Sequence, residues 1–499
     1  MLVLLLLFAC ARGPAASDTS AASATSATSA TTDSTAAIEP HDSSPETVEP
    51  SSLTIHGTPT AMVHSWVVTV EATEPLPAEL HCVSPEEPDE DFHYESDEAS
   101  TLHRFTVDGL LAETAYTCTA NAGDLEALLE LVTSPLPEHL PQLVPSGTPG
   151  EALAHGYLVF NTWRFDVAHG QQIVVTDPEG RIRWSTAAED SSQVDVDVTF
   201  LGEEGFLAAG GITLPPTRFA LDGTIAWQSG PTEPLGWHHD VRPAGPDELV
   251  ALTHRDNEHD GVTFLGFGLE VRRAWSDEIL WTWDSQQAVD AGTLPPAADE
   301  GADAYHANAV SWVPDDPDGP AFWVNLKFAD QIVRVDRSTG EITWRLGVGG
   351  DFALDDPHGV GWFYGQHDPE LTGLDRLVVF DNGVGRPGPE HSRVVGYELD
   401  LAARVVRPRW TWTEPDWYEP LFGDADTLAD GHVLVDKGRC KSCSSPLGGD
   451  DRVWSLIELD PETRQVVYRL DAATPDVSSY RADLVDGCEL FANARYCRP

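Results

Sequence analysis

The chain has 499 residues, of which 82 are Asp or Glu and 29 are Lys or Arg, so its formal net charge at pH 7 is −53. Phosphate backbones and anionic lipids repel such a charge, which argues against nucleic-acid binding. Apolar residues make up 41% of the chain, enough for a sizeable core, so a wholly disordered chain is excluded. The 16 Trp, 41 Gly and 37 Pro residues favour strands and tight turns over helices.

Residues 1–10 predict export. Leu2 to Phe8 is an apolar run that is too short to cross a bilayer as a helix and is typical of a signal peptide. Leu7-Phe8-Ala9-Cys10 looks like a bacterial lipobox, in which Cys10 carries the lipid; an ordinary signal with an incidental cysteine is the alternative. Ala11 stands where an Asp would favour retention in the inner membrane, so we expect a lipid-anchored protein of the outer membrane, facing the periplasm or the exterior.

Residues 11–50 consist mainly of Ala, Ser and Thr and predict a flexible tether, because they cannot bury apolar surface. This tether fits the lipid anchor, which is the only membrane contact that we expect.

Residues 51–137 have the pattern of a small β-sandwich module. Strand-like segments occur at Trp66–Val70, Leu102–Val107 and Ala115–Ala120. A Leu ahead of a Tyr-bearing strand resembles the late strands of fibronectin type III or immunoglobulin-like domains. The segment Glu86–Glu98 carries eight acidic residues and predicts a solvated loop, with a calcium site as the alternative.

The remainder, residues 145–499, repeats one pattern six times: a strand that ends in an acid, a turn, and a strand that ends in an aromatic residue. The copies span residues 173–184, 219–227, 267–281, 332–344, 395–410 and 456–468. Their spacing of about 40 to 65 residues fits one four-stranded blade each. The sequence therefore predicts an all-β chain with a six-bladed β-propeller; a β-sandwich does not explain a repeat of this length.

The cysteines also favour an oxidising compartment. Setting Cys10 aside leaves six, enough for three disulfides. Cys82 and Cys118 lie in one segment, and we expect them to pair. The other four predict two disulfides with three open connectivities, or alternatively a four-sulfur zinc site. These four are Cys440, Cys443, Cys488 and Cys497.

Three histidine-bearing segments lie between the repeats, where inner strands are expected. They are Trp237-His238-His239-Asp240, Tyr305-His306-Ala307-Asn308 and Gly365-Gln366-His367-Asp368. In a propeller these segments come from different blades and converge near one axial opening. We expect a functional cluster there; a three-histidine metal site is the alternative.

With further motifs, these segments resemble the bacterial arylsulfotransferase family in order and spacing. The further motifs are Ile342-Thr343-Trp344-Arg345-Leu346-Gly347, Phe380-Asp381-Asn382-Gly383 and Ser392-Arg393. The resemblance covers only the propeller part. It implies an exported six-bladed propeller that moves sulfate from an aryl sulfate to a phenol without a nucleotide donor. We expect neither a cofactor nor a metal.

The resemblance also implies residue roles. His367 would be the nucleophile that becomes sulfated, while His306 and His239, favoured over His238, would bind the sulfuryl group. A family Arg falls on Lys327, which keeps the positive charge but loses the bidentate fork. We expect His238, Asn308, Tyr305, Trp237 and Arg393 to contact substrate.

Elementary chemistry agrees with these roles. A neutral imidazole is nucleophilic near pH 7, and His306, His239 and Lys327 would stabilise the charge on the sulfuryl oxygens. Tyr305, Trp237 and Trp362 lie next to the histidines in the sequence and are candidates for aromatic walls of the pocket. Packing between blades is the alternative for each.

Other functions compete with sulfotransfer. A non-catalytic, decayed propeller that binds a ligand or partner at the cell envelope is the main alternative, since Lys327 departs from the family. A quinone-dependent dehydrogenase would need eight blades. A hydrolytic sulfatase would need a Cys or Ser two residues before a Pro and four before an Arg, and no cysteine of this chain fits that motif. The sequence predicts neither the natural substrates nor the oligomeric state.

Overall fold

The computed structural model describes residues 51–164, 171–186, 197–210, 214–230, 236–439, 454–474 and 477–497. The predicted signal and tether (1–50), with Cys10, lie outside these residues, as do Cys440 and Cys443. The described chain is almost entirely β, as predicted; its short helices are α1 (Glu151–Ala154), α2 (Gln286–Asp290), α3 (Gly487–Leu490) and the 3-10 turns η2 (Gly202–Glu204) and η3 (Lys327–Ala329). Among the described helices, none is long and apolar enough to cross a membrane.

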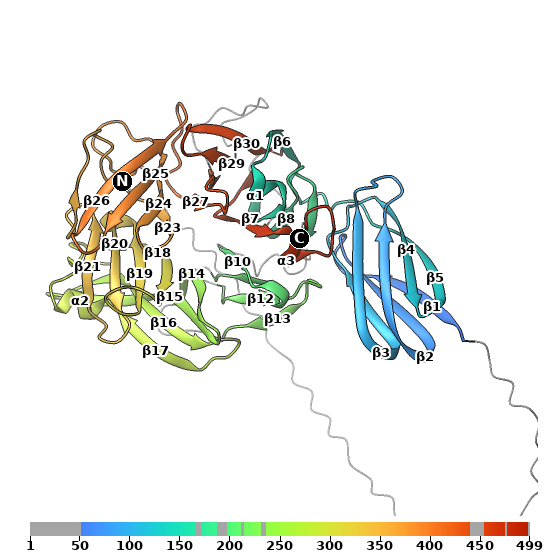
Figure 1. Cartoon of the computed structure of the whole chain (residues 1–499). Coiled ribbons are helices and arrows are strands. Elements are labelled where there is room, and N and C mark those ends of the chain that lie inside the picture. Colours follow the sequence, from blue (N-terminus) through green and yellow to red (C-terminus); the bar gives the residue numbers. More distant parts are fainter. Residues whose placement is uncertain are drawn as a thin grey trace, which may run out of the picture. The chain divides into compact units, whose positions relative to one another are not determined.

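The first five strands form one antiparallel sheet (Figure 1). They are β1 (Leu53–Pro59), β2 (Trp66–Val83), β3 (Asp91–Val107), β4 (Ala115–Ala122) and β5 (Leu125–Val132). The long strand β2 pairs with β3 on one side, and on its other side with β1 along its first half and with β4 along its second half. Buried residues alternate along β4, so one face of the sheet makes a core of its own around Leu80, Phe92 and Tyr116.

The acidic segment Glu86–Glu98 is not the loop that we expected. A turn ends at Glu90, and β3 begins at Asp91. The reason is the alternation of side chains along the strand: Phe92 is buried while Glu95 and Asp97 are exposed. Glu95 and Asp97 therefore occupy the solvent face of the strand, whereas Glu90, in the turn before it, is buried against Arg183.

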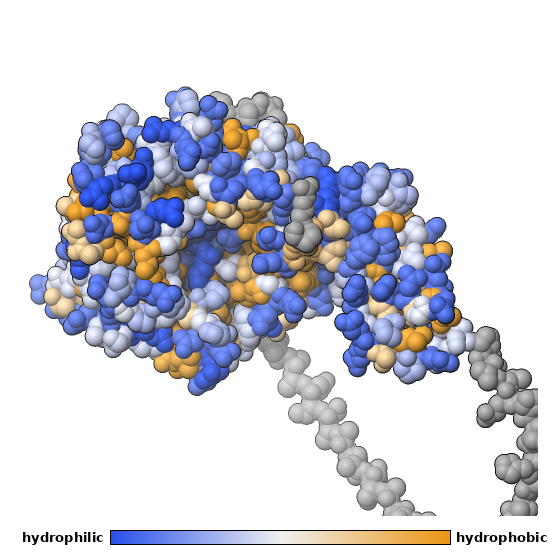
Figure 2. Space-filling model, in the orientation of Figure 1, coloured by the Kyte–Doolittle hydropathy of each residue, from blue (hydrophilic) through white to orange (hydrophobic). Residues whose placement is uncertain are grey.

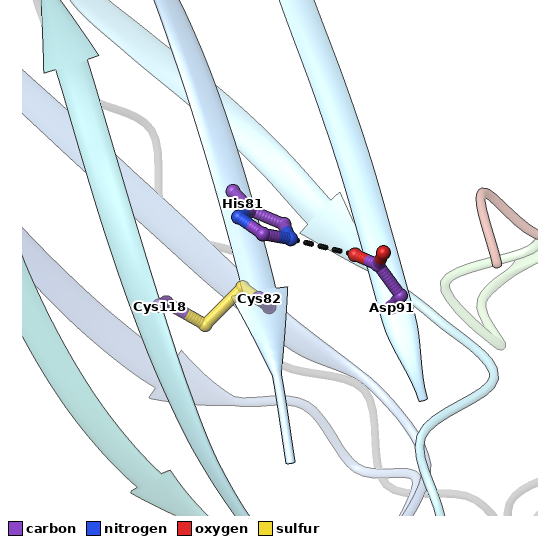
Figure 3. The surroundings of a disulfide bond; sticks show 4 residues. All are labelled: His81, Cys82, Asp91 and Cys118. Atoms are coloured by element: carbon purple, nitrogen blue, oxygen red, sulfur yellow. Dashed lines mark hydrogen bonds and ion pairs between the residues drawn. A yellow bond between two sulfur atoms is a disulfide. The ribbon is translucent and has the colours of Figure 1, made fainter. Parts of the chain in front are cut away.

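Two disulfides lie in the described chain. Cys82 on β2 stands directly opposite Cys118 on β4, with Cα atoms 4.0 Å apart, and the two are bonded as predicted (Figure 3). Cys488 is bonded to Cys497, which is one of the three connectivities left open.

The remaining strands form six further sheets of four or five strands each. They are described in chain order of their first inner-to-outer strands, and the first sheet also takes up two strands from the end of the chain. The first contains β7 (Gly156–Arg164), β8 (Gln172–Thr176), β9 (Ile182–Ser185), β31 (Val477–Ser478) and β32 (Ala482–Asp486). The second contains β10 (Val198–Phe200), β11 (Phe206–Ala208), β12 (Thr217–Phe219) and β13 (Ile225–Gln228). The third contains β14 (Trp237–Gly245), β15 (Glu248–His259), β16 (Val262–Arg273) and β17 (Ile279–Asp284).

The other three sheets continue in the same order. The fourth contains β18 (Ala307–Val313), β19 (Ala321–Leu326), β20 (Gln331–Asp336) and β21 (Ile342–Gly347). The fifth contains β22 (Ala353–Leu354), β23 (His367–Leu371), β24 (Arg376–Asp381), β25 (Arg393–Asp400) and β26 (Val405–Trp412). The sixth contains β27 (Asp424–Thr427), β28 (Val433–Asp436), β29 (Ser455–Asp460), β30 (Gln465–Ala472) and β6 (Leu143–Gly147).

Six apolar clusters join each of these sheets to the next, and the last sheet to the first. One pair from each cluster is Trp184 with Phe206, Leu207 with Trp237, Trp283 with Phe322, Trp344 with Leu377, Trp412 with Val435, and Trp454 with Phe160. A Trp thus packs at every junction. Of the aromatic residues that end the predicted repeats, Trp184, Trp344 and Tyr468 are buried in these clusters, and Trp227, Trp281 and Trp410 pack against them. The six sheets accordingly follow one another in a closed ring (Figure 1).

Both ends of this part of the chain close the ring. The early strand β6 adds to β30 of the sixth sheet, and the late strands β31 and β32 pair with β7 of the first. The inner strands β10, β14, β18, β23 and β27 belong to five different sheets, and residues of all five line one cavity.

Candidate active site

The three predicted histidine segments occupy equivalent places at the start of inner strands. The β-sheet register shifts between Trp237 and Val241 in β14, between Ala307 and Ala309 in β18, and between His367 and Glu370 in β23. A bulge of this kind re-aims side chains. His239 and His306 also have positive φ angles of 52° and 47°, a conformation that costs energy for residues other than glycine and that is concentrated at functional sites.

The imidazoles of the first two segments form one cluster. His239 Nε2 lies 3.2 Å from His306 Nε2. The His238 ring centre is 4.1 Å from that of His239 and 5.2 Å from that of His306. His254 on β15, which the sequence did not single out, lies 3.9 Å from His238, ring centre to ring centre. Burial and the neighbouring imidazoles hold the pKa of His238 and of His239 well below its ordinary value, so both rings are neutral near pH 7.

Asp303 fixes the orientation of His306. Its Oδ2 lies 2.7 Å from His306 Nδ1, and its Oδ1 accepts a 2.9 Å hydrogen bond from the His306 backbone N–H. Although burial alone would raise it, the pKa of Asp303 is lowered by these bonds from His306. The carboxylate therefore keeps a hydrogen on Nδ1, and His306 Nε2 points towards His239.

His367 has one defined tautomer. Asn382 Nδ2 donates to the carbonyls of Glu419 and Phe422 at 2.6 and 2.8 Å, so its Oδ1 is the atom that faces His367 Nδ1 at 2.7 Å. Since an amide oxygen only accepts, Nδ1 must donate, and the lone pair lies on Nε2. Burial and the positive charge of Lys327 hold the pKa of His367 well below its ordinary value. The ring is therefore neutral near pH 7, with its lone pair on Nε2.

Lys327 supplies a buried positive charge beside these rings. Its backbone N–H donates to the His306 carbonyl at 3.3 Å, and its Nζ donates to the carbonyl of Pro420 at 2.9 Å. Burial lowers the pKa of Lys327 to about 8, while burial raises that of its neighbour Glu419 to about 8. Near pH 7 the lysine is therefore mostly cationic and the glutamate mostly neutral, so the site carries a positive charge.

Asn308 positions the strand that carries His367. Its Oδ1 accepts a 2.6 Å hydrogen bond from Asn325 Nδ2, and Asn325 Oδ1 accepts one of 2.7 Å from Gln366 Nε2. The chain of amides links β18, β19 and the residue before His367, and all three side chains are buried.

An ion network of two arginines and three aspartates lies next to the histidines along the inner strands. Arg481 contacts Asp197 at 3.0 Å and Asp368 at 2.9 Å, and donates to the Asn308 carbonyl at 2.6 Å. Arg242 contacts Asp197 at 2.9 Å and Asp240 at 3.0 Å. The Tyr480 ring, beside Arg481, contacts both His239 and His367, with centres 5.5 and 5.8 Å away.

A cavity of about 1340 Å³ opens at the later residues of the inner strands. Carboxyl groups of Asp368, Glu370, Asp426 and Asp483 line it, together with Arg242. Figure 2 shows a hydrophilic hollow in the middle of the six sheets. His239, His306 and His367 lie at or just before the first residues of these strands and do not line this cavity.

Three residues that were expected to contact substrate are engaged elsewhere. Tyr305 is buried in an apolar cluster, and its hydroxyl donates to the Pro295 carbonyl. Arg393 uses its guanidinium on Asp381 and on the carbonyls of Val360 and Trp362. Trp237 packs in another apolar cluster with Arg272 over its ring. These contacts favour a packing role for all three.

An exposed apolar rim flanks Lys327 instead. Phe328 is 53% exposed and its ring stacks on that of His306, with centres 4.8 Å apart. Leu421 is 52% exposed, and its carbonyl lies 3.4 Å from Lys327 Nζ. An aromatic residue immediately after Lys327 is the sequence signal that could have pointed to this rim.

The fold thus brings a neutral imidazole, His367, close to a buried lysine, Lys327. Residues 124–481 match the profile of the arylsulfotransferase (ASST) family. The match covers more than half of the chain, and the chain belongs to this family. It begins at the turn before β5, within the first sheet, and so extends further towards the N-terminus than residue 145.

Individual relatives are distant. Arylsulfate sulfotransferase AssT of Lelliottia amnigena is 29% identical over 140 residues, which are 26% of this chain and 23% of the relative. The protein of the same name from Escherichia coli O6:H1 is 28% identical over the same shares. The chain thus spans about a quarter of the length of these relatives. The periplasmic gluconolactonase of Pseudomonas aeruginosa is 13% identical over 66% of this chain and 99% of its own, with a TM-score of 0.38, too low to carry an argument.

Proposed function

We propose that residues 145–499 form a six-bladed β-propeller and that residues 51–137 form a small β-sandwich. Six sheets joined by six apolar clusters support the propeller. The separate core of the first sheet and the contact between β1 and β5 support the sandwich.

We propose that the protein transfers a sulfuryl group from an aryl sulfate to a phenol through a sulfated His367. The observation that carries this proposal is the hydrogen bond from His367 Nδ1 to Asn382, which leaves the Nε2 lone pair free. Lys327 and the histidine cluster supply the donors and the positive charge that a sulfuryl group needs.

In the first step, His367 Nε2 attacks the sulfur and an N–S bond forms. The bond between sulfur and the aryl oxygen breaks, and its electron pair leaves with the phenolate. His306 acts in its protonated form: Asp303 holds the Nδ1 hydrogen, the Nε2 hydrogen passes to the phenolate, and a neutral His306 remains beside His239. Lys327 stabilises the charge on the sulfuryl oxygens.

In the second step, a new phenol gives its proton back to Nε2 of the neutral His306. Its oxygen attacks the sulfur, the N–S bond breaks, and the lone pair returns to His367 Nε2. Phe328 and Leu421 form the apolar rim of the site, and we propose that the aryl ring of donor or acceptor rests there. Two half-reactions through one covalent intermediate require ping-pong kinetics.

A chromogenic aryl sulfate, with and without an added phenol, tests this function. We expect phenol release to rise with acceptor and to need no nucleotide donor. Mixing with donor alone should add the mass of one sulfuryl group, and His367→Ala should lose both this adduct and turnover. His259→Ala is the matched control, because His259 is an exposed histidine outside the site.

Normal transfer by the His367→Ala variant would overturn the assignment of the nucleophile. Absence of transfer from every aryl sulfate tried, by a folded wild-type protein, would instead favour the non-catalytic binding propeller.

A further inference from the structure

The described residues contain three groups of side chains whose ligand atoms lie close enough to hold a metal ion: His238–His239–His306, Asp430–His432–Glu458 and His81–Asp91–His93. The first belongs to the candidate active site, where Lys327 and Arg481 oppose a cation. In the second, the carboxylates already accept the backbone N–H groups of Gly150 and Ala152. The third lies on the first sheet, far along the chain from the sulfotransferase motifs, and has neither drawback.

The geometry of the third group follows from strand register. His81 on β2 stands directly opposite His93 on β3, and their rings are stacked with centres 4.1 Å apart. Asp91 precedes His93 by two residues, so both side chains lie on the same face of β3. Asp91 Oδ1 is 2.6 Å from His81 Nε2 and 3.0 Å from His93 Nε2. Figure 3 shows His81 and Asp91 turned towards each other across the two strands.

The backbone holds these three residues in place. The His93 N–H donates to the Ala492 carbonyl at 3.2 Å, and the Asp91 carbonyl accepts from the Ala494 N–H at 2.8 Å. The disulfide Cys82–Cys118, next to His81, joins β2 to β4. The side chains nevertheless remain accessible, with exposures of 41% for His81, 37% for Asp91 and 58% for His93. The site is therefore rigid and open to solvent.

We propose that His81, Asp91 and His93 bind a divalent transition-metal ion of the zinc class. Two imidazole nitrogens and one carboxylate oxygen are a ligand set that zinc prefers, with water in the remaining position. The imidazoles then carry their hydrogens on Nδ1 and present the Nε2 lone pairs to the metal. Exposed acids of the segment Glu86–Glu98, among them Glu86, Asp89 and Glu95, favour cations near the site. This site is independent of sulfotransfer.

Titration of the metal-free full-length chain with zinc chloride, followed by calorimetry, tests the site. We expect one equivalent of zinc that is lost in His93→Ala and in Asp91→Asn. His56→Ala, which removes a histidine from β1 of the same sheet, should keep it. His306→Ala should keep it as well, which distinguishes this site from the histidine cluster of the active site. Cobalt chloride supplies a second readout, since its visible absorption band should vanish with the same variants.

Equal zinc stoichiometry and affinity in wild type, His93→Ala and Asp91→Asn would overturn the proposal, and so would binding that disappears only in His306→Ala. Because all three side chains are partly exposed, the variants should remain folded; circular dichroism and the intact Cys82–Cys118 bond check this.

Discussion

At His367, reactivity depends on which ring nitrogen carries the hydrogen. Asn382 decides this, because two carbonyls fix its amide and leave only its oxygen for His367 Nδ1. Asn382→Ala removes the acceptor and allows either tautomer. We expect kcat to fall by about 100- to 10,000-fold, since loss of the group that fixes the tautomer of the histidine in a Ser-His-Asp triad costs about 10,000-fold, with a smaller change in KM.

Nitrogen NMR of the His367 ring gives a readout that a purely structural role would not change. In wild type the signals should report a hydrogen on Nδ1, and in Asn382→Ala a mixture. Unchanged ring signals and an unchanged kcat would contradict the positioning role of Asn382.

The lowered pKa of Lys327 predicts that activity falls at alkaline pH. A lysine is cationic below its pKa, and burial lowers that pKa to about 8. The rate of the first half-reaction should therefore fall as the pH rises through about 8. In Lys327→Arg the guanidinium stays charged, so this alkaline fall in the rate should disappear. Lys327→Met should lower the rate by about 100- to 1000-fold, as when one preorganised donor is removed.

Single-turnover rates between pH 6 and 10, measured with donor alone, check this prediction, because the ionisation of an acceptor phenol does not enter. An identical alkaline limb in wild type and Lys327→Arg would show that another group titrates.

The sequence predicted the histidines and Lys327 but missed the residues that orient them. His239, His306 and His367 could be found because each follows the same place in successive repeats. Asp303 and Asn382 act through contacts that exist only after folding, and Arg481 reaches the site from the last strands of the chain. Asn382 and Arg393 both belong to motifs that match the family. The guanidinium of Arg393, however, contacts Asp381 and the carbonyls of Val360 and Trp362.

At the scale of strands, periodicity predicted the repeats well and the bulges not at all. The inner strands of the third, fourth and fifth sheets all carry a register shift beside a histidine, and such a shift leaves no mark in the alternation of residues. The acidic start of β3 was misjudged for a related reason. Charge dominated the reading of Glu86–Glu98, whereas β3 begins at Asp91 with Phe92 buried and with Glu95 and Asp97 exposed.

The disulfide Cys82–Cys118 should govern the stability of the first sheet. It closes a loop with a sequence separation of 36, which corresponds to about 4 kcal/mol in the chain-entropy treatment. The double variant Cys82→Ala/Cys118→Ala should lower the free energy of unfolding of this sheet by about that amount. Cys488→Ala/Cys497→Ala opens a loop with a separation of only 9 and should cost about 2.6 kcal/mol.

Denaturant unfolding followed by tryptophan fluorescence, with Trp66 as the reporter of the first sheet, distinguishes the two variants. Equal losses in both, or a larger loss in the second, would contradict the loop-length argument.

For the whole molecule, a net charge of −53 has to coexist with a ring whose centre is also acidic. Asp197, Asp240 and Asp368 meet around Arg481 and Arg242, and burial raises the pKa of Asp240 to about 6 and that of Asp483 to about 7. Arg481 belongs to the segment between β31 and β32, so one side chain ties the end of the chain to β10, β14 and β23. Closure of the ring is thus electrostatic as well as apolar.

Arg481→Met should therefore weaken the whole ring. Removing one partner from a buried ion network typically costs about 3–5 kcal/mol, because the remaining charges stay buried without compensation. The loss should depend on pH. Carboxyls with a raised pKa in the folded state hold protons that the unfolded chain releases, so their stabilising effect is complete below about pH 4 and is lost as the pH rises towards 7. Without Arg481 these pKa values rise further, and the deficit relative to wild type should be smaller at pH 5 than at pH 8. Melting temperatures of wild type and Arg481→Met at the two pH values measure this difference. Arg376→Met, at an exposed arginine, is the control. A deficit that is independent of pH would show that Arg481 contributes packing rather than charge.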